Sequence, residues 1–346
     1  MIVDTAKAGI SIGTFGRRLR VAPGTGALPT LASRQKTIDL GRGRAGVALM
    51  DFTPEQPWPL SECNLDSAPP PFFYHTLDFP DGTSVTGQWD IRGRFDSYIG
   101  NYPLGGKTVL DAGTATGFLA FSAERAGASA VTALDVRSAA ECPRIPFHDS
   151  LFHRDRAKWI KDHDEQLFRP LKKGFWYAWH KLNSRVEVIY APLDQLYGWD
   201  RTFDVVLAGA IIEHIADPIS AIGAYARLAN EAVIIAFTDI LDTDEWVMRP
   251  AHDLSRQAVD FEWWSLSRGL YRQVFDNLGF TIEIHHDPKA IHTPHEGYEK
   301  EFTRPTLVAR RKPPEEMTLP RSARPDESIT TTNSGWRSRL GRGLSR

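Results

Sequence analysis

The chain has 346 residues, of which 42% are hydrophobic and 24% are charged, so it can bury a globular core and is not a wholly disordered polypeptide. No segment approaches about 18 consecutive apolar residues, and no apolar run near the N-terminus has the form of a secretory signal. We therefore expect a cytoplasmic protein without a membrane-spanning helix.

Charge is unevenly distributed, although the net charge is only −2. Residues 1–48 contain eight Lys or Arg and two Asp, a net charge of +6, and residues 312–346 contain seven Lys or Arg and four Asp or Glu, a net charge of +3. The central part has 26 basic against 37 acidic residues, a net charge of −11. We expect a flexible basic arm at 1–50 and a disordered tail at 312–346. Any nucleic-acid contact would come mainly from these two segments.

Between the arm and the tail, short apolar segments with strand character alternate with amphipathic helical segments. Strands are predicted at 109–111, 130–136, 186–191, 203–210, 232–238, 280–285 and 306–310. Helices are predicted at 118–126, 175–182, 217–228 and 267–278. This alternation predicts an α/β fold with a mostly parallel sheet and helices on both faces. The last two strands have no helix between them, which indicates an antiparallel pair. Residues 138–173 do not follow the alternation and are expected to form an insertion over the sheet.

The turn after the first strand combines two acids with two glycines. Asp111 ends the strand, Gly113 and Gly117 follow, and Asp135 ends the next strand 24 residues later. In the G-x-G-x-x-G motif of a dinucleotide site, the second glycine lets the backbone approach a pyrophosphate. If Gly113 is aligned with the first glycine, the second glycine is replaced by Ala115 here. An acidic turn favours a cationic ligand over a diphosphate, and a carboxylate at the second strand's end is typical of ribose binding.

These features resemble the class I S-adenosylmethionine-dependent methyltransferases. The turn Asp111-Ala-Gly113-Thr-Ala-Thr-Gly117 resembles their first motif, D-x-G-x-x-x-G, and residues 203–214 resemble their fourth-strand motif. The resemblance covers residues 72–311. It implies a Rossmann-like, seven-stranded sheet with an antiparallel last strand, and S-adenosylmethionine as the cofactor. It also implies a methyltransferase domain at 106–311, preceded by an extension at 51–105 over the substrate side.

The resemblance implies roles for individual residues. The cofactor contacts that it implies are Asp111, Gly113, Thr114, Gly117, Asp135, Val136, Asp194, Gly209 and Ala210. Asp194 stands two positions beyond the place where an Asp of this family often contacts adenine. His214 and Glu213, after the fourth strand, are the candidates for positioning or deprotonating the acceptor. The candidates for substrate contact are His75, Asp90, Asp239 and Trp263.

A finer resemblance concerns the tRNA wobble-uridine methyltransferases of the 5-oxyacetic acid pathway. It rests on the leader Tyr74-His75-Thr76-Leu77-Asp78, on residues 174–178 and on residues 263–267. Glu213 departs from that subgroup, which often has Tyr before the His.

Several functions stay open from the sequence alone. We expect methyl transfer to an oxygen, nitrogen or carbon of a small molecule. The alternatives are a tRNA acceptor reached through the basic arms, a nicotinamide-dependent oxidoreductase, and a non-catalytic protein of the same fold. The His- and Asp-rich stretch 148–164 lacks the spacing of a metal site, so we expect no metal and interpret it as a substrate-covering lid.

Overall fold

The computed structural model describes residues 51–63, 72–142, 155–193, 195–237, 239–251, 263–294 and 297–317. The predicted arm at 1–50, most of the predicted tail and Asp194 lie outside these residues. The chain divides into two units at Arg311, and the elements up to β14 belong to the first unit. No described helix has both the length and the apolar character needed to cross a bilayer.

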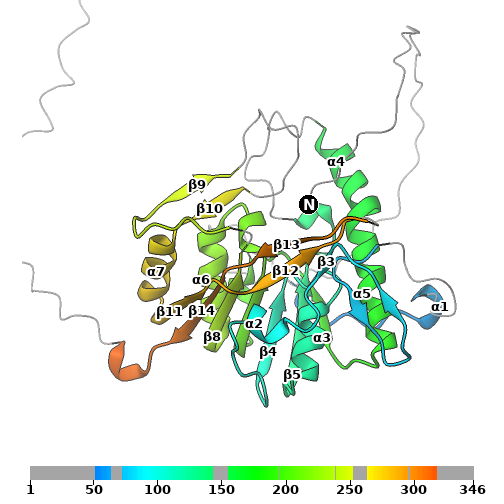
Figure 1. The fold of residues 1–346 in the computed structure, drawn as a ribbon, viewed down its shortest axis with the longest axis horizontal. Helices are drawn as coiled ribbons and strands as arrows, with labels where there is room; N and C mark the ends of the chain where they lie inside the picture. Colours follow the sequence, from blue (N-terminus) through cyan, green and yellow to red (C-terminus); the bar gives the residue numbers. More distant parts are fainter. Residues whose placement is uncertain are drawn as a thin grey trace, which may run out of the picture. The chain divides into compact units, whose positions relative to one another are not determined.

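A seven-stranded sheet forms the centre of the first unit (Figure 1). The strand order is β11-β14-β8-β7-β4-β5-β6, in which β14 is antiparallel to both neighbours and every other adjacent pair is parallel. The predicted antiparallel last strand is thereby confirmed, and it lies inside the sheet while β11 forms the edge. The strands are β4 (Thr108–Ala112), β5 (Ala130–Asp135), β6 (Glu187–Tyr190), β7 (Phe203–Gly209), β8 (Ala229–Ala236), β11 (Phe280–His285) and β14 (Thr306–Arg311).

Helices cover both faces of the sheet, as the alternating sequence pattern predicted. Val109 and Leu110 are both completely buried, and they belong to opposite cores because successive side chains of a strand point to opposite faces. Val109 packs in the core that contains Phe118 and Phe175, whereas Leu110 packs in the core that contains Tyr225. The helices are α3 (Phe118–Arg125) and α5 (Arg169–Lys181) on the first face, and α6 (Pro218–Leu228) and α7 (Arg268–Asn277) on the second.

The helix ends show why these segments are helical. The Asp217 side chain accepts a hydrogen bond from the backbone N–H of Ser220 at 3.1 Å and caps α6, whose first residue is the predicted proline. After α3 and α7, Gly127 and Gly279 adopt φ angles of +86° and +80°, the left-handed conformation that ends helices. The sequence predictions of these boundaries are confirmed.

The described part of the segment 138–173 is helical. It contains α4 (Arg156–His163), a π-helical turn (Asp164–Phe168) and the beginning of α5. α5 begins six residues before the predicted start at 175, because Pro170 suits a first helical turn and Leu171 adds to the buried face. This segment therefore includes the crossover helix between β5 and β6.

A small antiparallel sheet that the sequence did not predict lies in front of the large sheet in the view of Figure 1. The hairpin of β12 (Lys289–His292) and β13 (Lys300–Thr303) pairs with β3 (Trp89–Asp90), so it brings the region before β14 next to the N-terminal extension. The remaining elements are α1 (Leu60–Cys63), β1 (Leu77–Asp78), β2 (Ser84–Val85), α2 (Phe95–Tyr98), β9 (Met248–Pro250) and β10 (Trp264–Leu266).

Candidate functional site

The glycine turn between β4 and α3 depends on left-handed backbone conformations. Gly113 and Gly117 have φ angles of +82° and +89°. A Cβ atom on Gly113 would lie 2.8 Å from Cγ1 of Ile211, so a larger residue would collide with the segment after β7. Ala115, at the position where a dinucleotide motif has its second glycine, also adopts a left-handed φ of +50°. The turn therefore has the backbone of a glycine-rich loop with a side chain at one strained position.

Asp111 supports this turn from the inside. Its side chain is completely buried, and Oδ2 accepts hydrogen bonds from the Thr114 hydroxyl at 2.7 Å and from the Ala120 backbone N–H at 3.1 Å. Burial raises the pKa of Asp111 to about 7, although the hydrogen bond from Thr114 acts in the opposite direction. Asp111 was predicted as a cofactor contact, and in this structure its carboxyl group holds the turn to the start of α3.

Asp135 marks one end of a narrow cavity at the carboxyl ends of β4, β5 and β7. Its Oδ2 accepts a hydrogen bond from the Ala115 N–H at 2.9 Å, and its Oδ1 accepts one from the Val136 N–H at 2.7 Å. We call this part the Asp135 pocket; its lining includes Asp135, Gly113, Ala115, Phe168, Ile211 and His214. Val136 and Asp135 also line two smaller recesses beside it.

A second part of the cavity lies beyond Gly113 and is bounded by aromatic side chains and one arginine. We call it the Arg304 pocket; its lining includes Tyr74, His75, Trp89, Tyr98, His214 and Arg304. Five residues line both pockets, so the two adjoin: Tyr74, Gly113, Gly209, Ala210 and His214. Their volumes are about 60 and 70 Å³, against roughly 300–1,000 Å³ for a pocket that encloses a small organic ligand. A ligand of that size requires the surrounding side chains to move outward.

Two histidines face this cavity. His214 ends the short 3₁₀ turn Ile212–His214 after β7 and lines both pockets. His75 lines the Arg304 pocket, and its backbone N–H donates to the Thr116 hydroxyl at 3.3 Å. Burial lowers the pKa of His75 to about 3, an effect that Asp90 partly opposes, so His75 is neutral at pH 7. Its Nδ1 atom is buried and has no hydrogen-bond partner among the described residues.

Two predicted residues near His214 lie elsewhere than expected. Glu213 is buried and lines neither pocket. Burial raises the pKa values of Tyr98 and Tyr271, and the charge of Glu213 adds to this effect. Trp263, predicted to contact substrate, is also buried, and its backbone N–H donates to the Glu213 carbonyl at 2.8 Å. Both side chains therefore belong to the protein interior.

Two further predicted substrate residues line neither pocket. Asp90 binds Arg92 through both carboxylate oxygens; burial would raise the pKa of Asp90, but the hydrogen bonds from Arg92 bring it below its usual value. Asp239 is exposed, and it accepts a hydrogen bond from the following Ile240 N–H at 2.9 Å. Gly117, a predicted cofactor contact, lines neither pocket and instead begins α3.

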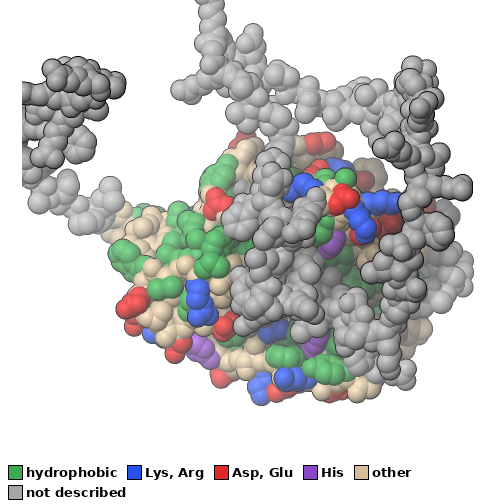
Figure 2. Space-filling view, turned by 90° about the horizontal axis from the view of Figure 1, so that it is seen from above, with side chains coloured by type: hydrophobic (Ala, Val, Ile, Leu, Met, Phe, Trp, Pro, Cys, Tyr) green, Lys and Arg blue, Asp and Glu red, His purple; other side chains and the backbone are tan. Residues whose placement is uncertain are grey.

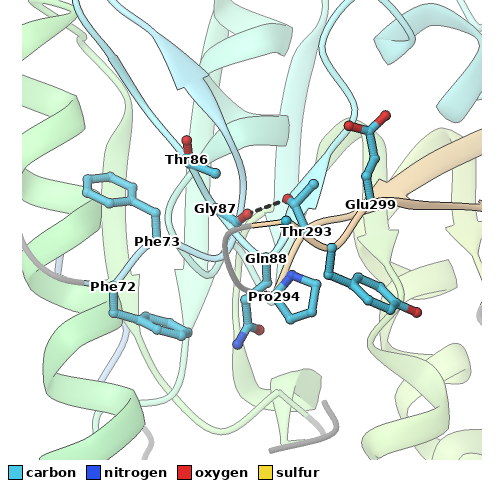
Figure 3. Close-up of a pocket in the computed structure, with 10 residues that line it drawn as sticks. Phe72, Phe73, Thr86, Gly87, Gln88, Thr293, Pro294 and Glu299 are labelled. Atoms are coloured by element: carbon cyan, nitrogen blue, oxygen red, sulfur yellow. Dashed lines mark hydrogen bonds between the residues drawn. The ribbon is translucent and has the colours of Figure 1, made fainter.

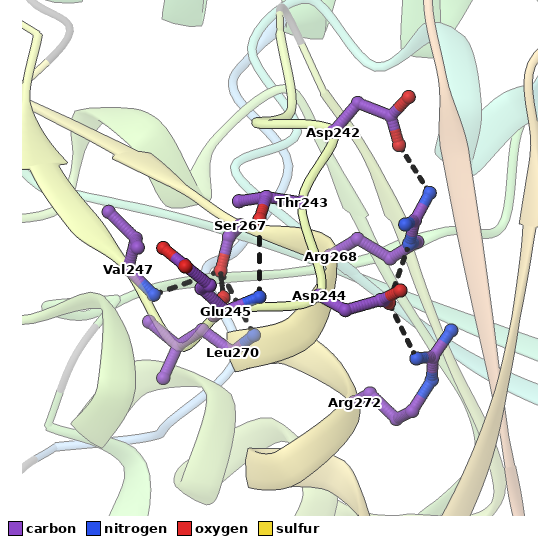
Figure 4. A network of polar contacts seen from close by, with 9 residues as sticks. All are labelled: Asp242, Thr243, Asp244, Glu245, Val247, Ser267, Arg268, Leu270 and Arg272. Atoms are coloured by element: carbon purple, nitrogen blue, oxygen red, sulfur yellow. Dashed lines mark hydrogen bonds and ion pairs between the residues drawn. The ribbon is translucent and has the colours of Figure 1, made fainter.

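The loop after β8 is fixed to the start of α7 by a polar network (Figure 4). The Ser267 hydroxyl accepts from the Val247 N–H at 3.0 Å and donates to the Glu245 carbonyl at 2.5 Å. Arg268 forms ion pairs with Asp242 and with Asp244. The acidic residues of this loop thus stabilise its attachment to α7.

A larger cavity of about 790 Å³ is lined by residues of the N-terminal extension and of the segment that follows β12 (Figure 3). Phe72, Gln88 and Pro294 line it, and the Thr293 hydroxyl donates to the Gly87 carbonyl across its wall at 2.7 Å. None of the residues that line it comes from the carboxyl ends of the parallel strands, where ligands of open α/β sheets bind. We therefore place the candidate site at the cavity between Asp135 and Arg304.

Sequence reasoning missed Arg304 and Tyr98, both of which line the Arg304 pocket. Arg304 stands before Pro305 and the last strand, in no motif, and it reaches the site only through the unpredicted β12–β13 hairpin. Tyr74 was noticed as part of a leader motif. Among the described residues, no group of three or more His, Cys, Asp or Glu is placed to hold a metal, and His148, Asp149 and His153 lie outside them.

The comparisons with known proteins identify the family of the chain. The sequence profile of a family described as "Methyltransferase domain" matches residues 94–284, which is more than half of the chain. No curated protein matches.

Among solved structures, the chain is similar to magnesium protoporphyrin IX methyltransferase from Synechocystis PCC 6803 with bound SAM (16% identity, 64% of this chain, 78% of that chain, TM-score 0.37). It is also similar to the N-terminal domain of EvdMO1 in the presence of SAH and D-fucose (16% identity, 73% of this chain, 95% of that chain, TM-score 0.44). A third similar structure is that of 1,6-didemethyltoxoflavin-N1-methyltransferase from Burkholderia thailandensis (14% identity, 64% of this chain, 78% of that chain, TM-score 0.37). At these identities the similarity concerns the fold alone.

Proposed function

Because the chain belongs to the methyltransferase-domain family and is an S-adenosylmethionine-dependent enzyme, we propose that it methylates a small molecule held beside His214. The nicotinamide-dependent and non-catalytic alternatives are set aside on the same ground. The proposal concerns the acceptor and the roles of individual residues.

The residues of the Asp135 pocket fit the adenosine part of this cofactor. Asp135 presents a carboxylate whose orientation is fixed by the backbone N–H groups of Ala115 and Val136. A carboxylate at this strand end accepts hydrogen bonds from ribose hydroxyls. Phe168 and Ile211 supply apolar walls suited to a planar base, and Gly113 and Gly209 leave the adjoining backbone open to the amino-acid part.

The shared middle of the cavity would then be the place of methyl transfer. S-adenosylmethionine, when bound, supplies an electrophilic methyl group on a positively charged sulfur. Gly209 ends β7, Ala210 and His214 follow it, and all three line both pockets, so a group there is reachable from either end. The Arg304 pocket, with Tyr74 and Trp89, would hold the acceptor.

The two histidines would have different roles. His75 is neutral, and its buried Nδ1 atom has no partner within the described part of the chain, which suits it to orient a hydroxyl or amine by hydrogen bonding. A group with a pKa of about 3 is a poor proton acceptor at pH 7. His214, at the junction of the pockets, is therefore the side chain that we assign to removing a proton from the acceptor.

The observation that carries the proposal is the carboxylate of Asp135, anchored by the glycine turn inside a cavity that continues to His214. The test is transfer of radiolabelled methyl from S-adenosylmethionine into a small-molecule cell extract, with purified tRNA as the parallel acceptor. We expect labelled small molecules with the wild type and none with D135N. Label in neither fraction, with the wild type proven to be folded, would contradict the proposal.

A tRNA acceptor is the second candidate, and it rests on the leader resemblance and the basic arm. His75 and Tyr74 of that leader line the Arg304 pocket, which is the observation in its favour. On the face drawn in Figure 2, however, visible basic and acidic side chains are interspersed. Labelled tRNA, together with tRNA binding that weakens steeply as salt rises, would favour this candidate over a small molecule.

A further inference from the structure

Arg304 occupies an unusual position for a charged residue. It lies between β13 and β14, and only 7% of the residue is exposed. Its guanidinium carbon is 4.3 Å from the centre of the Trp89 ring, and its backbone N–H donates to the Pro288 carbonyl at 2.7 Å. The guanidinium group is thus held against an aromatic platform at the wall of a cavity.

Arg304 supplies a charged side chain to the wall of the Arg304 pocket. Among the described residues that line the Arg304 pocket, Arg304 is the only Lys, Arg, Asp or Glu. The nearby acids Glu213 and Asp111 line neither pocket, and both are buried on the protein side. Burial is the main cause that raises the pKa of Tyr98; the charges of Glu213 and Asp111 add to it, and Arg304 acts in the opposite direction. A ligand in the pocket therefore lies against a guanidinium group and against no carboxylate of the described lining residues.

We propose that Arg304, stacked on Trp89, forms a carboxylate-binding subsite at the end of the cavity opposite Asp135; this inference rests on the proposed function. The guanidinium fork matches both oxygens of a carboxylate, and the aromatic surroundings weaken competition from water. Two reactants can bring the carboxylate: the amino-acid part of the cofactor, or the methyl acceptor. The structure assigns the chemistry of the bound group, and the experiment identifies its source.

The first measurement uses the wild-type protein, because a buried arginine can matter for folding. Calorimetry compares S-adenosylhomocysteine with its decarboxylated analogue, which keeps the adenosine and the amine. A second titration compares benzoate with benzamide on protein saturated with S-adenosylhomocysteine. We expect the carboxylate compound to bind at least about tenfold more tightly in one of these two pairs.

The second measurement uses R304Q and R304K, with R310Q as the matched control. Arg310 also stacks on an aromatic ring, at 4.6 Å from Tyr102, but it is exposed and lines neither pocket. We expect R304Q to remove the preference for the carboxylate compound and R304K to retain part of it. R310Q should bind as the wild type does.

The outcomes separate the possibilities. A preference in the first pair assigns the subsite to the cofactor's carboxylate, and a preference in the second pair assigns it to the acceptor. Equal binding within both pairs overturns the subsite, even if S-adenosylhomocysteine itself binds well. Absence of any S-adenosylhomocysteine binding would instead contradict the proposed function.

Discussion

The two ends of the cavity differ in charge and in how the chain builds them. The Asp135 end is negative. Its carboxylate and glycine turn come from residues 108–136, and its walls are completed by Phe168, Ile211 and His214. The Arg304 end is positive and combines residues from 74–75, 89, 98 and 304, which are far apart in the sequence. The polar anchor of the Asp135 end is local in sequence and follows a motif, whereas the Arg304 end is assembled by long-range contacts. We expect the Asp135 end to bind the common cofactor and the Arg304 end to select the acceptor.

The largest expected effect is at the Asp135 end. D135N removes the charge that would bind the ribose hydroxyls, and each hydrogen bond to a charged group contributes about 1.5–3 kcal/mol. We expect S-adenosylhomocysteine to bind at least about 100-fold more weakly by calorimetry. The control is D239N, which changes an exposed acid at another strand end and should leave the affinity unchanged. Equal affinities of D135N and the wild type for S-adenosylhomocysteine would contradict a role of the Asp135 carboxylate in cofactor binding.

The next effect concerns the junction of the two ends. H214A should lower methyl transfer at least about 100-fold, because a positioned proton acceptor contributes about 10²–10⁴ to a rate. Binding of S-adenosylhomocysteine should change less than threefold. The readout is labelled methyl transfer in a single turnover, and H286A, at an exposed histidine, serves as the control. Full transfer by H214A would assign His214 to packing only.

The third effect is on stability and belongs to the support of the Asp135 end. The pKa of Asp111 is about 7 in the folded protein, against the usual 3.8 of an aspartate side chain. Between these values the unfolded carboxyl loses its proton while the folded one keeps it, so the free energy of unfolding decreases as pH rises. Each pKa unit corresponds to about 1.4 kcal/mol.

D111N removes this titration and keeps an oxygen that accepts from Thr114. Urea unfolding at pH 4.5 and pH 7.5 should show the wild type losing about 3 kcal/mol of stability relative to D111N. A stability difference between the two proteins that is the same at both pH values would mean that Asp111 is ionised in the folded state.

The smallest effect is at Ala115. A left-handed conformation costs an L-residue about 1–2 kcal/mol, and the greater freedom of glycine in the unfolded chain offsets about 0.4–1 kcal/mol of that. A115G should therefore raise the free energy of unfolding by about 0.5–1 kcal/mol without changing cofactor affinity. A126G makes the same chemical change at a φ of −74° and should destabilise instead. Destabilisation by A115G would show that the alanine methyl group contributes more by packing than its conformation costs.

The sequence predicted those elements of the fold that a local pattern of residues determines. Apolar runs located all seven strands of the large sheet, and Asp217 with Pro218 located the start of α6. Asp135 was found because it ends a strand next to a glycine turn. The β12–β13 hairpin was missed because its strands are short and partly polar, and its pairing with β3 joins segments about 200 residues apart.

The acceptor half was beyond prediction for the same reason. Arg304 has no motif around it, and its burial depends on Trp89, which a different region of the chain provides. Glu213 and Trp263 are buried and line neither pocket, which the sequence did not reveal because it does not show which side chain turns inward. Sequence spacing therefore identified the strand ends, while the direction of each side chain depended on packing.

The central claim is that the cavity between Asp135 and Arg304 binds the adenosyl cofactor, and calorimetric titration of the wild-type protein tests it most directly. With S-adenosylhomocysteine, S-adenosylmethionine and NAD as ligands, the account predicts one site that binds both adenosyl sulfur compounds competitively and no heat from NAD. Binding of NAD, or no detectable binding of S-adenosylhomocysteine and S-adenosylmethionine at millimolar concentration, would contradict this claim.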